Sequence, residues 1–376
     1  MNRYRHLTKE QRQFSTLLKA GLWGTPADVS AFDHQTDWME LLLMAKKQAC
    51  IGVVYDGVLS LPVELQPPRS ISLQWATIVA QIEEDNEFLN GKLAEVFALY
   101  RDNGIYPILL KGQGVAQNYR IPLHRNSGDI DVYVGDADYE KANALLRKEA
   151  SGGSEETNKH ASIYWRGVTV ENHRIMTHLN APGSNQYFVD YLKGWYPNGS
   201  RTLNVGGYNV AVCPLEFDIT FVLIHSVLHF LNEGVGLRQI CDWTCMLSAQ
   251  HENVDRKSLL DLLEGVGLMK AARAFGVIAV EFLGLPPAYL PFDLSEKDYL
   301  LGEWLLYDVL KGGNFGWYYK DMEKRPKGYW SGKWYTFTRA FRRCRELGRI
   351  APAEARWYPL YLAYASAKAQ VKLRLK

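Results

Sequence analysis

The chain has 376 residues, of which 47% are hydrophobic and 22% are charged. This composition is typical of a soluble globular protein and excludes a disordered or fibrous one. No uninterrupted apolar run is long enough to span a bilayer, and no apolar segment follows the basic N-terminus, so we expect neither a transmembrane helix nor a secretory signal. The five cysteines are scattered and odd in number, which suits a reducing compartment better than a disulfide framework. We therefore expect a cytoplasmic protein.

The charges are unevenly distributed along the chain. Residues 320–376 contain 15 Lys+Arg and four Asp+Glu, a net charge of +11, whereas the rest of the chain carries −9. A basic segment of this kind could contact nucleic acid, an anionic membrane surface, or the acidic body of its own protein. We favour the intramolecular or solvated interpretation. Nucleic-acid binding has weak support from this segment, and we do not expect peripheral membrane contact.

The first hundred residues are predicted to be mostly helical. Two segments, 36–59 and 82–104, carry apolar residues at helical spacing. A proline-broken connection separates them. We expect Asn103-Gly104 to end the second helix as a C-cap.

The hydrophobic period then changes from helical to alternating. Strands are predicted at 105–110 and 129–134, and a turn leading into a helix at 111–120. Residues 151–160 are predicted to be a loop, and 162–175 a hairpin that turns at Arg166-Gly167. Strands that alternate with helices predict a small mixed sheet with flanking helices.

From Pro214 onward the pattern is helical again, interrupted by a linker rich in proline at 285–295. We therefore expect an α+β fold in which a small sheet domain is embedded in a largely helical chain. The expected regions are an N-terminal helical part, an α/β domain, a helical domain, and a basic, aromatic-rich C-terminal helical part: 1–100, 101–212, 213–295 and 296–376.

Asp129 and Asp131 interrupt an otherwise apolar strand. Because successive side chains of a strand point to opposite faces, Ile130, Val132 and Val134 share the core face, and the two aspartates share the other. Two carboxylates on one face repel each other unless a cation lies between them. A divalent metal is the simplest compensator, and Gly128 just before the pair leaves room for a ligand.

A third carboxylate follows from the same alternation. Val168 and Val170 face the core, so Glu171 lies on the opposite side together with Thr169 and His173. If this hairpin pairs beside the aspartate strand, three carboxylates converge. Two Mg²⁺ ions held by such a set are the apparatus of phosphoryl or nucleotidyl transfer. Mg²⁺ is expected rather than Zn²⁺ because the donors are hard oxygens, and Mn²⁺ is an alternative.

The segment before these aspartates contains the pattern Leu110-Lys111-Gly112 at a strand-to-helix junction. Glycine permits close approach of the backbone, and amides at a helix N-terminus favour an anion. Lys111 adds a positive charge. The junction is therefore a candidate for binding a triphosphate.

These motifs resemble those of the nucleotidyltransferase superfamily that includes DNA polymerase beta, and more closely those of a bacterial family of uncharacterised nucleotidyltransferases. The resemblance extends over roughly residues 15–250. It rests on an apolar-Lys-Gly turn, a Tyr and a Pro before an Arg, a Gly-Asp-Ile-Asp strand, an apolar-Glu-x-His strand, and a later helical segment. The matching residues are Leu110-Lys111-Gly112, Tyr119, Pro122, Arg125, Gly128-Asp129-Ile130-Asp131, Val170-Glu171-Asn172-His173, His225, His229, Gly236-Leu237-Arg238 and Asp242.

The resemblance implies that a nucleoside monophosphate is moved from an NTP, which we expect to be ATP, to a hydroxyl or phosphate acceptor. Asp129 and Asp131 would bind both metal ions, and Glu171 would complete the catalytic one. The residues expected to bind the nucleotide are Lys111, Gly112, Gln113, Arg125 and Gly128. The wider superfamily usually has Gly-Ser or Gly-Gly where this chain has Gly112-Gln113, a departure that concerns triphosphate binding.

A polar stripe on the predicted helix after Pro214 contains His225 and His229. Such a stripe could face the acceptor, and one histidine could take a proton from its hydroxyl. The residues expected near the acceptor are His173, His225, His229, Arg238 and Asp242. The alternative is that the two histidines are hydrogen-bonded interface residues that orient Arg238 or Asp242.

Two rival functions stay open at this point. One is a catalytically inactive protein that binds a nucleotide or a partner, against which the complete carboxylate set argues. The other is an RNA-binding or tRNA-modifying protein that uses the basic C-terminal segment.

Overall fold

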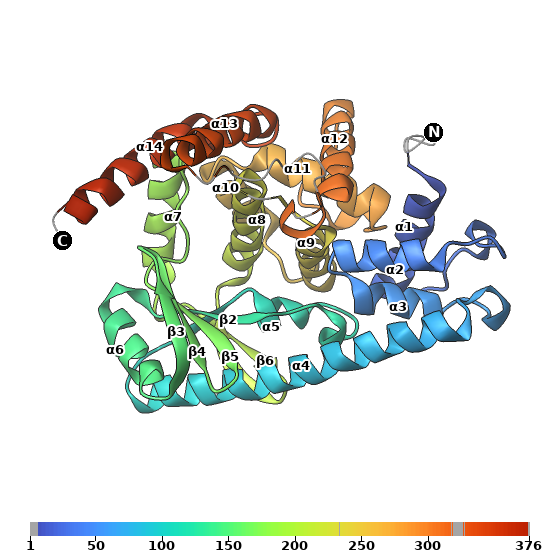
Figure 1. Ribbon diagram of the computed structural model, residues 1–376, viewed down its shortest axis with the longest axis horizontal. Helices are drawn as coiled ribbons and strands as arrows, with labels where there is room; N and C mark the ends of the chain where they lie inside the picture. Colours follow the sequence, from blue (N-terminus) through green and yellow to red (C-terminus); the bar gives the residue numbers. More distant parts are fainter. Residues whose placement is uncertain (1–6, 233, 317, 319–325, 327, 375–376) are drawn as a thin grey trace.

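A computed structural model describes residues 7–232, 234–316, 318, 326 and 328–374 (Figure 1). A mixed sheet lies at one side of the molecule, and helices from both ends of the chain cover the rest (Figure 1). Among the described residues, no helix combines the length and apolar character that crossing a bilayer requires. The α+β class predicted from the sequence is confirmed. The proposed division into four regions stays a prediction.

The N-terminal part is helical, as predicted. Its helices are α1 (Lys9–Trp23), α2 (Trp38–Lys47), α3 (Ile51–Leu59) and α4 (Arg69–Asp102). The first begins with a capping box in which Thr8 and Gln11 exchange hydrogen bonds between side chain and backbone. The fourth is 34 residues long and ends at Asn103 and Gly104, where the latter has a φ of 70°. This is the C-cap predicted from the sequence.

The sheet has seven strands in the order β3-β4-β5-β2-β1-β7-β6. Parallel pairs join β2 to β5 and β1 to β7, and the other neighbours are antiparallel. Their bounds are β1 Ile108–Leu110, β2 Asp129–Tyr133, β3 Ala150–Glu156, β4 His160–Trp165, β5 Val168–His173, β6 Arg201–Val205 and β7 Tyr208–Val212. The short helix α5 (Gly112–Ala116) follows β1.

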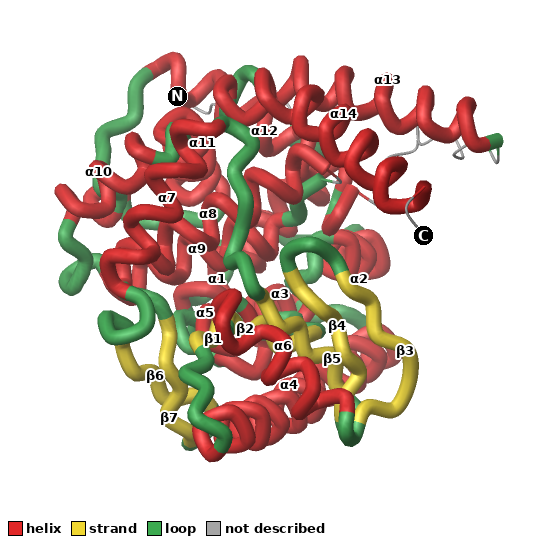
Figure 2. Tube along the Cα trace, turned by 90° about the vertical axis from the view of Figure 1, so that its left-hand side faces the viewer, coloured by secondary structure: helices red, strands yellow, loops and turns green. Residues whose placement is uncertain are grey.

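The two faces of this sheet have different surroundings. One face packs on α4 and on α6 (Gly135–Arg147), which lie against the strands in Figure 1. Ile130 and Val132 are buried in this core together with Phe97 and Tyr139, as their alternation predicts. The opposite face, which carries the aspartates, is turned toward the helical half of the chain (Figure 2).

The predicted hairpin forms β4 and β5, which pair antiparallel on either side of Arg166 and Gly167. The predicted loop at 151–160 is wrong, because β3 occupies most of it. This strand lies at the edge of the sheet, and its described side chains are largely exposed. An edge strand that is exposed on both faces needs no apolar alternation, so its polar sequence gave no strand signal.

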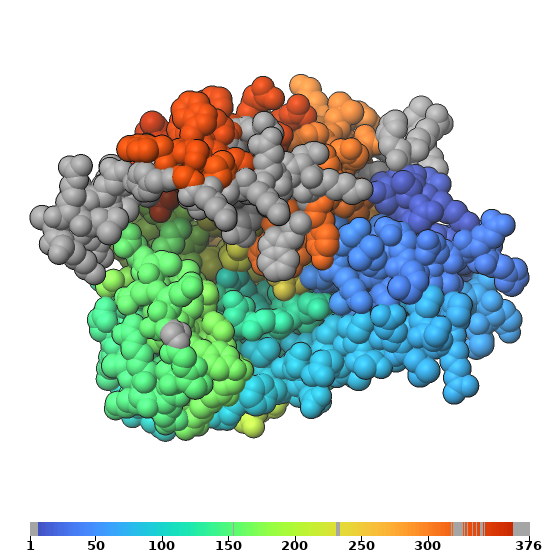
Figure 3. All heavy atoms as spheres, in the orientation of Figure 1, coloured from blue at the N-terminus to red at the C-terminus, as the bar shows by residue number. Residues whose placement is uncertain are grey.

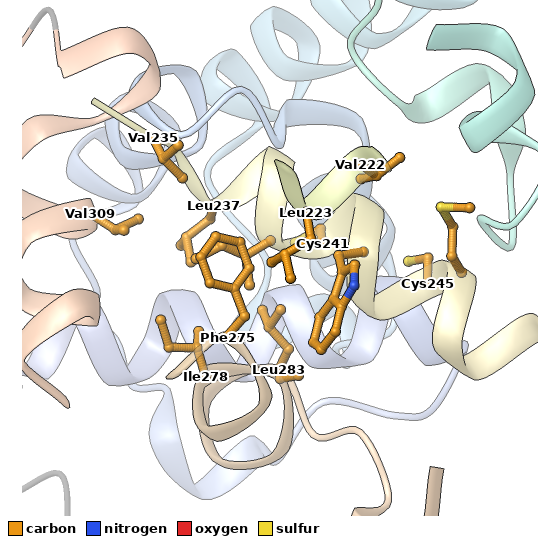
Figure 4. Packing of buried hydrophobic residues seen from close by; sticks show 14 of the residues in the cluster. Val222, Leu223, Val235, Leu237, Cys241, Cys245, Phe275, Ile278, Leu283 and Val309 are labelled. Carbon is orange, nitrogen blue, oxygen red and sulfur yellow. The ribbon is translucent and has the colours of Figure 1, made fainter. Parts of the chain in front are cut away.

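After β5 the chain adds eight α-helices among the described residues. They are α7 Pro182–Trp195, α8 Leu215–Asn232, α9 Leu237–Gln250, α10 Arg256–Gly265, α11 Met269–Val277, α12 Glu296–Gly312, α13 Tyr329–Leu347 and α14 Pro352–Arg374. Helices α8, α9 and α11 share a continuous apolar core (Figure 4). In it, Leu237, Cys241 and Phe275 are at most 1% exposed. The cysteines here pack as small apolar residues.

The basic C-terminal segment contacts the body of its own protein through Arg343 on α13. Its guanidinium pairs with both carboxylate oxygens of Asp308 at 3.1 and 3.2 Å and lies 4.1 Å from the ring centre of Phe230. This cation therefore has an intramolecular acidic partner, in line with the interpretation that we favoured. Much of the remaining basic segment lies outside the described side chains.

Helices α1 and α3 approach each other through glycine, which gives a test of the fold. A Cβ atom on Gly57 would lie 2.0 Å from the carbonyl oxygen of Leu17, whereas a Cβ on Gly91 of α4 would meet nothing within 4 Å. We expect Gly57→Ala to lower the free energy of unfolding by about 1–3 kcal/mol through overpacking. Gly91→Ala should raise it by about 1 kcal/mol through helix propensity. Chemical denaturation of both variants checks this, and equal effects would contradict the packing.

Candidate active site

The register between β2 and β5 brings three carboxylates together. The strands run parallel, with Asp129 opposite Thr169 and Asp131 opposite Glu171. Oxygens of Asp129, Asp131 and Glu171 all lie within 4.8 Å of one another. The convergence expected from the strand pattern is therefore present in the structure.

Asp131 is the most enclosed of the three, with 3% of its surface exposed. Its Oδ1 lies 3.1 Å from Lys111 Nζ and 2.9 Å from His173 Nε2. Burial alone would raise the pKa of this carboxyl, but Lys111 and His173 hold the pKa well below its usual range. Lys111 has a φ of 53°, which is uncommon outside glycine and marks a backbone held in place for its side chain.

Asp129 is less well compensated. The negative charge of Asp131, followed by burial, raises the pKa of Asp129 to about 6, although Lys111 and Arg238 act in the opposite direction. Two adjacent carboxylates are thus held against their mutual repulsion. An all-oxygen set with excess negative charge fits a hard divalent cation such as Mg²⁺.

Glu171 is oriented by its neighbours on the hairpin. Ser162 Oγ donates a hydrogen bond of 2.8 Å to Glu171 Oε1. The other oxygen, Oε2, lies 3.6 Å from His173 Nε2, and Oε1 lies 3.7 Å from His160 Nε2. Burial acts to raise the pKa of Glu171, but the nearby imidazole of His173 and its other partners lower it overall, so the carboxylate stays ionised.

These groups line a cavity of about 460 Å³ between the sheet, α8, α9 and the segment Asn314–Gly316. The surface is hollowed where the green sheet region meets the helical parts of the molecule (Figure 3). Of the site residues expected from the sequence, all but Gln113 line this cavity. The set comprises Lys111, Gly112, Arg125, Gly128, Asp129, Asp131, Glu171, His173, His225, His229, Arg238 and Asp242.

Gln113 lies elsewhere. Its side chain is 2% exposed, and its Nε2 donates to Asn86 Oδ1 of α4 at 3.3 Å. The side-chain amide of Gln113 therefore joins α5 to α4 and does not line the cavity, and the expectation that Gln113 binds the nucleotide stays a prediction. Helix α5 is also only five residues long, too short for its N-terminus to attract an anion by a helix dipole.

Arg125 is tied into a buried ion pair. Its Nε and Nη2 donate to the two oxygens of Asp242 at 2.7 and 2.8 Å, and Tyr119 Oη donates to the same carboxylate at 2.7 Å. Burial acts to raise the pKa of Asp242, but Arg125 outweighs it and lowers this pKa. The pair joins the loop before β2 to helix α9. A bidentate contact of this kind fixes orientation as well as charge.

Arg238 has a different role from Arg125. Among the described residues its guanidinium makes no ion pair, and its Nη1 donates to the carbonyl of Asn126 at 2.9 Å. Its buried Nε has no hydrogen-bond partner there. Burial and the positive charge of Arg125 lower the pKa of Arg238. The cavity therefore contains a cation whose charge is not balanced by a carboxylate contact.

Helix α8 contributes the opposite wall through His225 and His229. Their rings are 4.2 Å apart, and His225 Nε2 lies 3.5 Å from Lys111 Nζ. Burial, followed by the charge of Lys111, lowers the pKa of His225 well below its usual value. The imidazole is thus neutral. Asp218, earlier on α8, instead pairs with Arg201 at 2.8 Å.

Several lining residues were not anticipated from the sequence. His160 stands directly opposite His173 in the hairpin, and counting outward from the predicted turn at Arg166-Gly167 would have found it. Lys159 adjoins it. Phe315 reaches the cavity from a distant segment and packs 5.3 Å from the ring of His229. No spacing in the sequence indicates that contact.

Known proteins provide an independent comparison. A search of curated proteins finds no match. A similar solved structure is the crystal structure of an antigenic nucleotidyltransferase-like protein from Paracoccidioides brasiliensis, with a TM-score of 0.29 and 14% sequence identity, covering 49% of this chain and 87% of that chain. The family model described as uncharacterised nucleotidyltransferase matches residues 34–284, more than half of the chain. The chain therefore belongs to the uncharacterised nucleotidyltransferase family.

Proposed function

We propose that the protein transfers a nucleoside monophosphate from an NTP, with ATP as the expected donor, to a hydroxyl or phosphate acceptor. The observation that carries this proposal is the convergence of Asp129, Asp131 and Glu171 at the edge of a cavity lined by Lys111 and Arg238. Clustered carboxylates beside cations suit a substrate that is itself anionic and enters with divalent ions. The family membership supports the same class of reaction.

Asp129, Asp131 and Glu171 would hold the divalent ions. Bound there, Mg²⁺ or Mn²⁺ supplies charge stabilisation at the α-phosphate and lowers the pKa of the acceptor. The oxygen-only donor set fits this role, and the raised pKa of Asp129 reflects a site that favours a cation. Ser162 keeps Glu171 oriented through its hydrogen bond of 2.8 Å.

In the transfer step, the acceptor oxygen forms a bond to the α-phosphorus while the bond from that phosphorus to the oxygen of the β-phosphate breaks. Pyrophosphate leaves with the bonding electron pair. For a hydroxyl acceptor, the proton would pass to the unprotonated imidazole of His225, which lines the cavity. His229 and Phe315 would form the acceptor side of the cavity, where their rings meet.

The triphosphate would be bound by Lys111 and Arg238 rather than by Arg125. The guanidinium of Arg125 is engaged by Asp242 on two nitrogens, so its charge is already used. Arg238 lines the same cavity and has no ion pair within the described part of the chain. Phosphate oxygens are good partners for such a guanidinium. Arg125 would instead position α9, and with it Arg238.

The two arginines give a paired test. Arg238→Gln should raise the KM for the NTP about tenfold or more, because a charge-assisted hydrogen bond contributes about 1.5–3 kcal/mol. Its effect on thermal unfolding should be small. Arg125→Gln should lower the free energy of unfolding by about 3–5 kcal/mol, because it leaves Asp242 buried without its partner. Steady-state kinetics and denaturation of both variants measure this contrast. An unfolding loss for Arg238→Gln as large as that for Arg125→Gln would contradict the assignment.

The transferase activity itself is tested through Asp129. We expect Asp129→Asn to reduce transfer of label from an α-labelled NTP with Mg²⁺ by at least about 100-fold. The same change should raise the free energy of unfolding at neutral pH by about 1–2 kcal/mol. The reason is that a carboxyl with a folded-state pKa of about 6, above its ordinary value, costs stability when ionised above that pH. The measurements are label transfer in cell extract, separated into protein, RNA and small molecules, and chemical denaturation.

Asp136→Asn is the matched control. Asp136 is exposed, lies in the first turn of α6, and does not line the cavity. This variant should transfer label as the unaltered protein does. Label that appears in no fraction, or that persists in Asp129→Asn, would count against the proposed function. The labelled fraction identifies the class of acceptor.

A further inference from the structure

We propose that His160, Glu171 and His173 form a second metal site, specific for a borderline transition ion such as Zn²⁺, beside the carboxylate centre. Ligand atoms of these three residues all lie within 4.8 Å of one another. The site itself is independent of the proposed transferase activity. Its effect on that activity, argued below, rests on the proposed function.

The geometry is already close to what such an ion requires. Donor atoms at about 2.0–2.1 Å from tetrahedral zinc lie about 3.4 Å from each other. Here Glu171 Oε1 lies 3.7 Å from His160 Nε2, and Glu171 Oε2 lies 3.6 Å from His173 Nε2. All three donor atoms lie within 4.8 Å of one another, so no two of them have to approach each other by more than about 1.4 Å to reach this spacing.

The backbone holds these side chains in register. His160 and His173 are direct partners across the antiparallel pair of β4 and β5, and Ser162 is the partner of Glu171. Side chains at such positions share a face and stand next to each other. Because both strands lie inside the sheet, no loop has to order before an ion can bind. Ser162 donates to Glu171 Oε1 and so provides the outer hydrogen bond that orients a metal-binding carboxylate.

His173 is the most buried of the three proposed ligands. This imidazole is 6% exposed, and its Nδ1 has no hydrogen-bond partner in the described part of the chain. A buried ring with one unpaired nitrogen is costly unless the other nitrogen makes strong contacts. That other nitrogen, Nε2, is the one directed at Asp131 and Glu171.

The donor types separate the two sites. Asp129, Asp131 and Glu171 offer only oxygen, which suits Mg²⁺. Two imidazoles and one carboxylate suit Zn²⁺ or Co²⁺ and leave a coordination position for water. His160, Glu171 and His173 all line the cavity, so that position would face its interior.

Glu171 belongs to both sets, so the two sites compete for it. A carboxylate drawn into the histidine site leaves the oxygen site with Asp129 and Asp131 only. His173 would also release Asp131, which it contacts at 2.9 Å. Zn²⁺ at the histidine site would therefore inhibit Mg²⁺-dependent transfer.

The test is titration of the full-length protein with Co²⁺ in excess Mg²⁺, followed by visible absorption. We expect one equivalent to give the intense absorption of a four- or five-coordinate ion with nitrogen ligands. The affinity should fall at least tenfold in His160→Ala. His251→Ala, which removes a histidine outside the cavity, and Asp129→Asn should both keep the signal. Thermal unfolding of each variant verifies its folding.

An unchanged spectrum and affinity in His160→Ala would overturn the proposal, as would weak absorption typical of six oxygen ligands in the unaltered protein. Retention of the signal in Asp129→Asn distinguishes this site from the carboxylate centre. The binding result can be read even if no transfer is detected, so failure of the proposed function and failure of this inference are separate outcomes. If transfer is detected, Zn²⁺ should inhibit it at a concentration at least tenfold lower in the unaltered protein than in His160→Ala.

Discussion

The repulsion between Asp129 and Asp131 is the constraint on which the rest of the site depends. Their strand is buried on one face by the core over α4 and α6, so neither side chain can turn away without moving a whole strand. The surroundings compensate one carboxylate and leave the other with a raised pKa. Lys111 reaches Asp131 from the end of β1, where a positive φ aims its side chain. Such an arrangement costs folding stability, and the proposed metal binding is the use that it would serve.

The sequence predicts those parts of the site that follow from the alternation of apolar and polar side chains along a strand. Ile130 and Val132 on one side of a strand require Asp129 and Asp131 on the other, and the same rule places Glu171. Both inferences need only the period of two and the assumption that the hairpin pairs next to the aspartate strand, which the register confirms. The helical character of both ends of the chain follows from apolar spacing in the same way.

Features that depend on tertiary contacts could not be predicted from the pattern of apolar and polar residues in the sequence. Strand β3 is polar because it lies at an exposed edge, so its composition indicated a loop. Gln113 follows Gly112 directly, yet one step along α5 turns its side chain into the interior instead of the cavity. The different uses of Arg125 and Arg238 could not be foreseen, because nothing in their spacing tells which guanidinium is engaged by Asp242.

The ion pair between Arg125 and Asp242 also determines how the two halves of the chain relate. One partner lies just before β2 and the other on α9, and both are at least nine-tenths buried. Separating a buried bidentate pair would expose an uncompensated charge and cost about 3–5 kcal/mol. Helix α9 is therefore fixed to the sheet, and with it Arg238, which lies four residues before Asp242 on the same face of that helix and lines the same cavity as Asp129. The cavity is thus preorganised by an interaction that takes no part in the proposed chemistry, which is how a rigid site can present its charges without rearrangement.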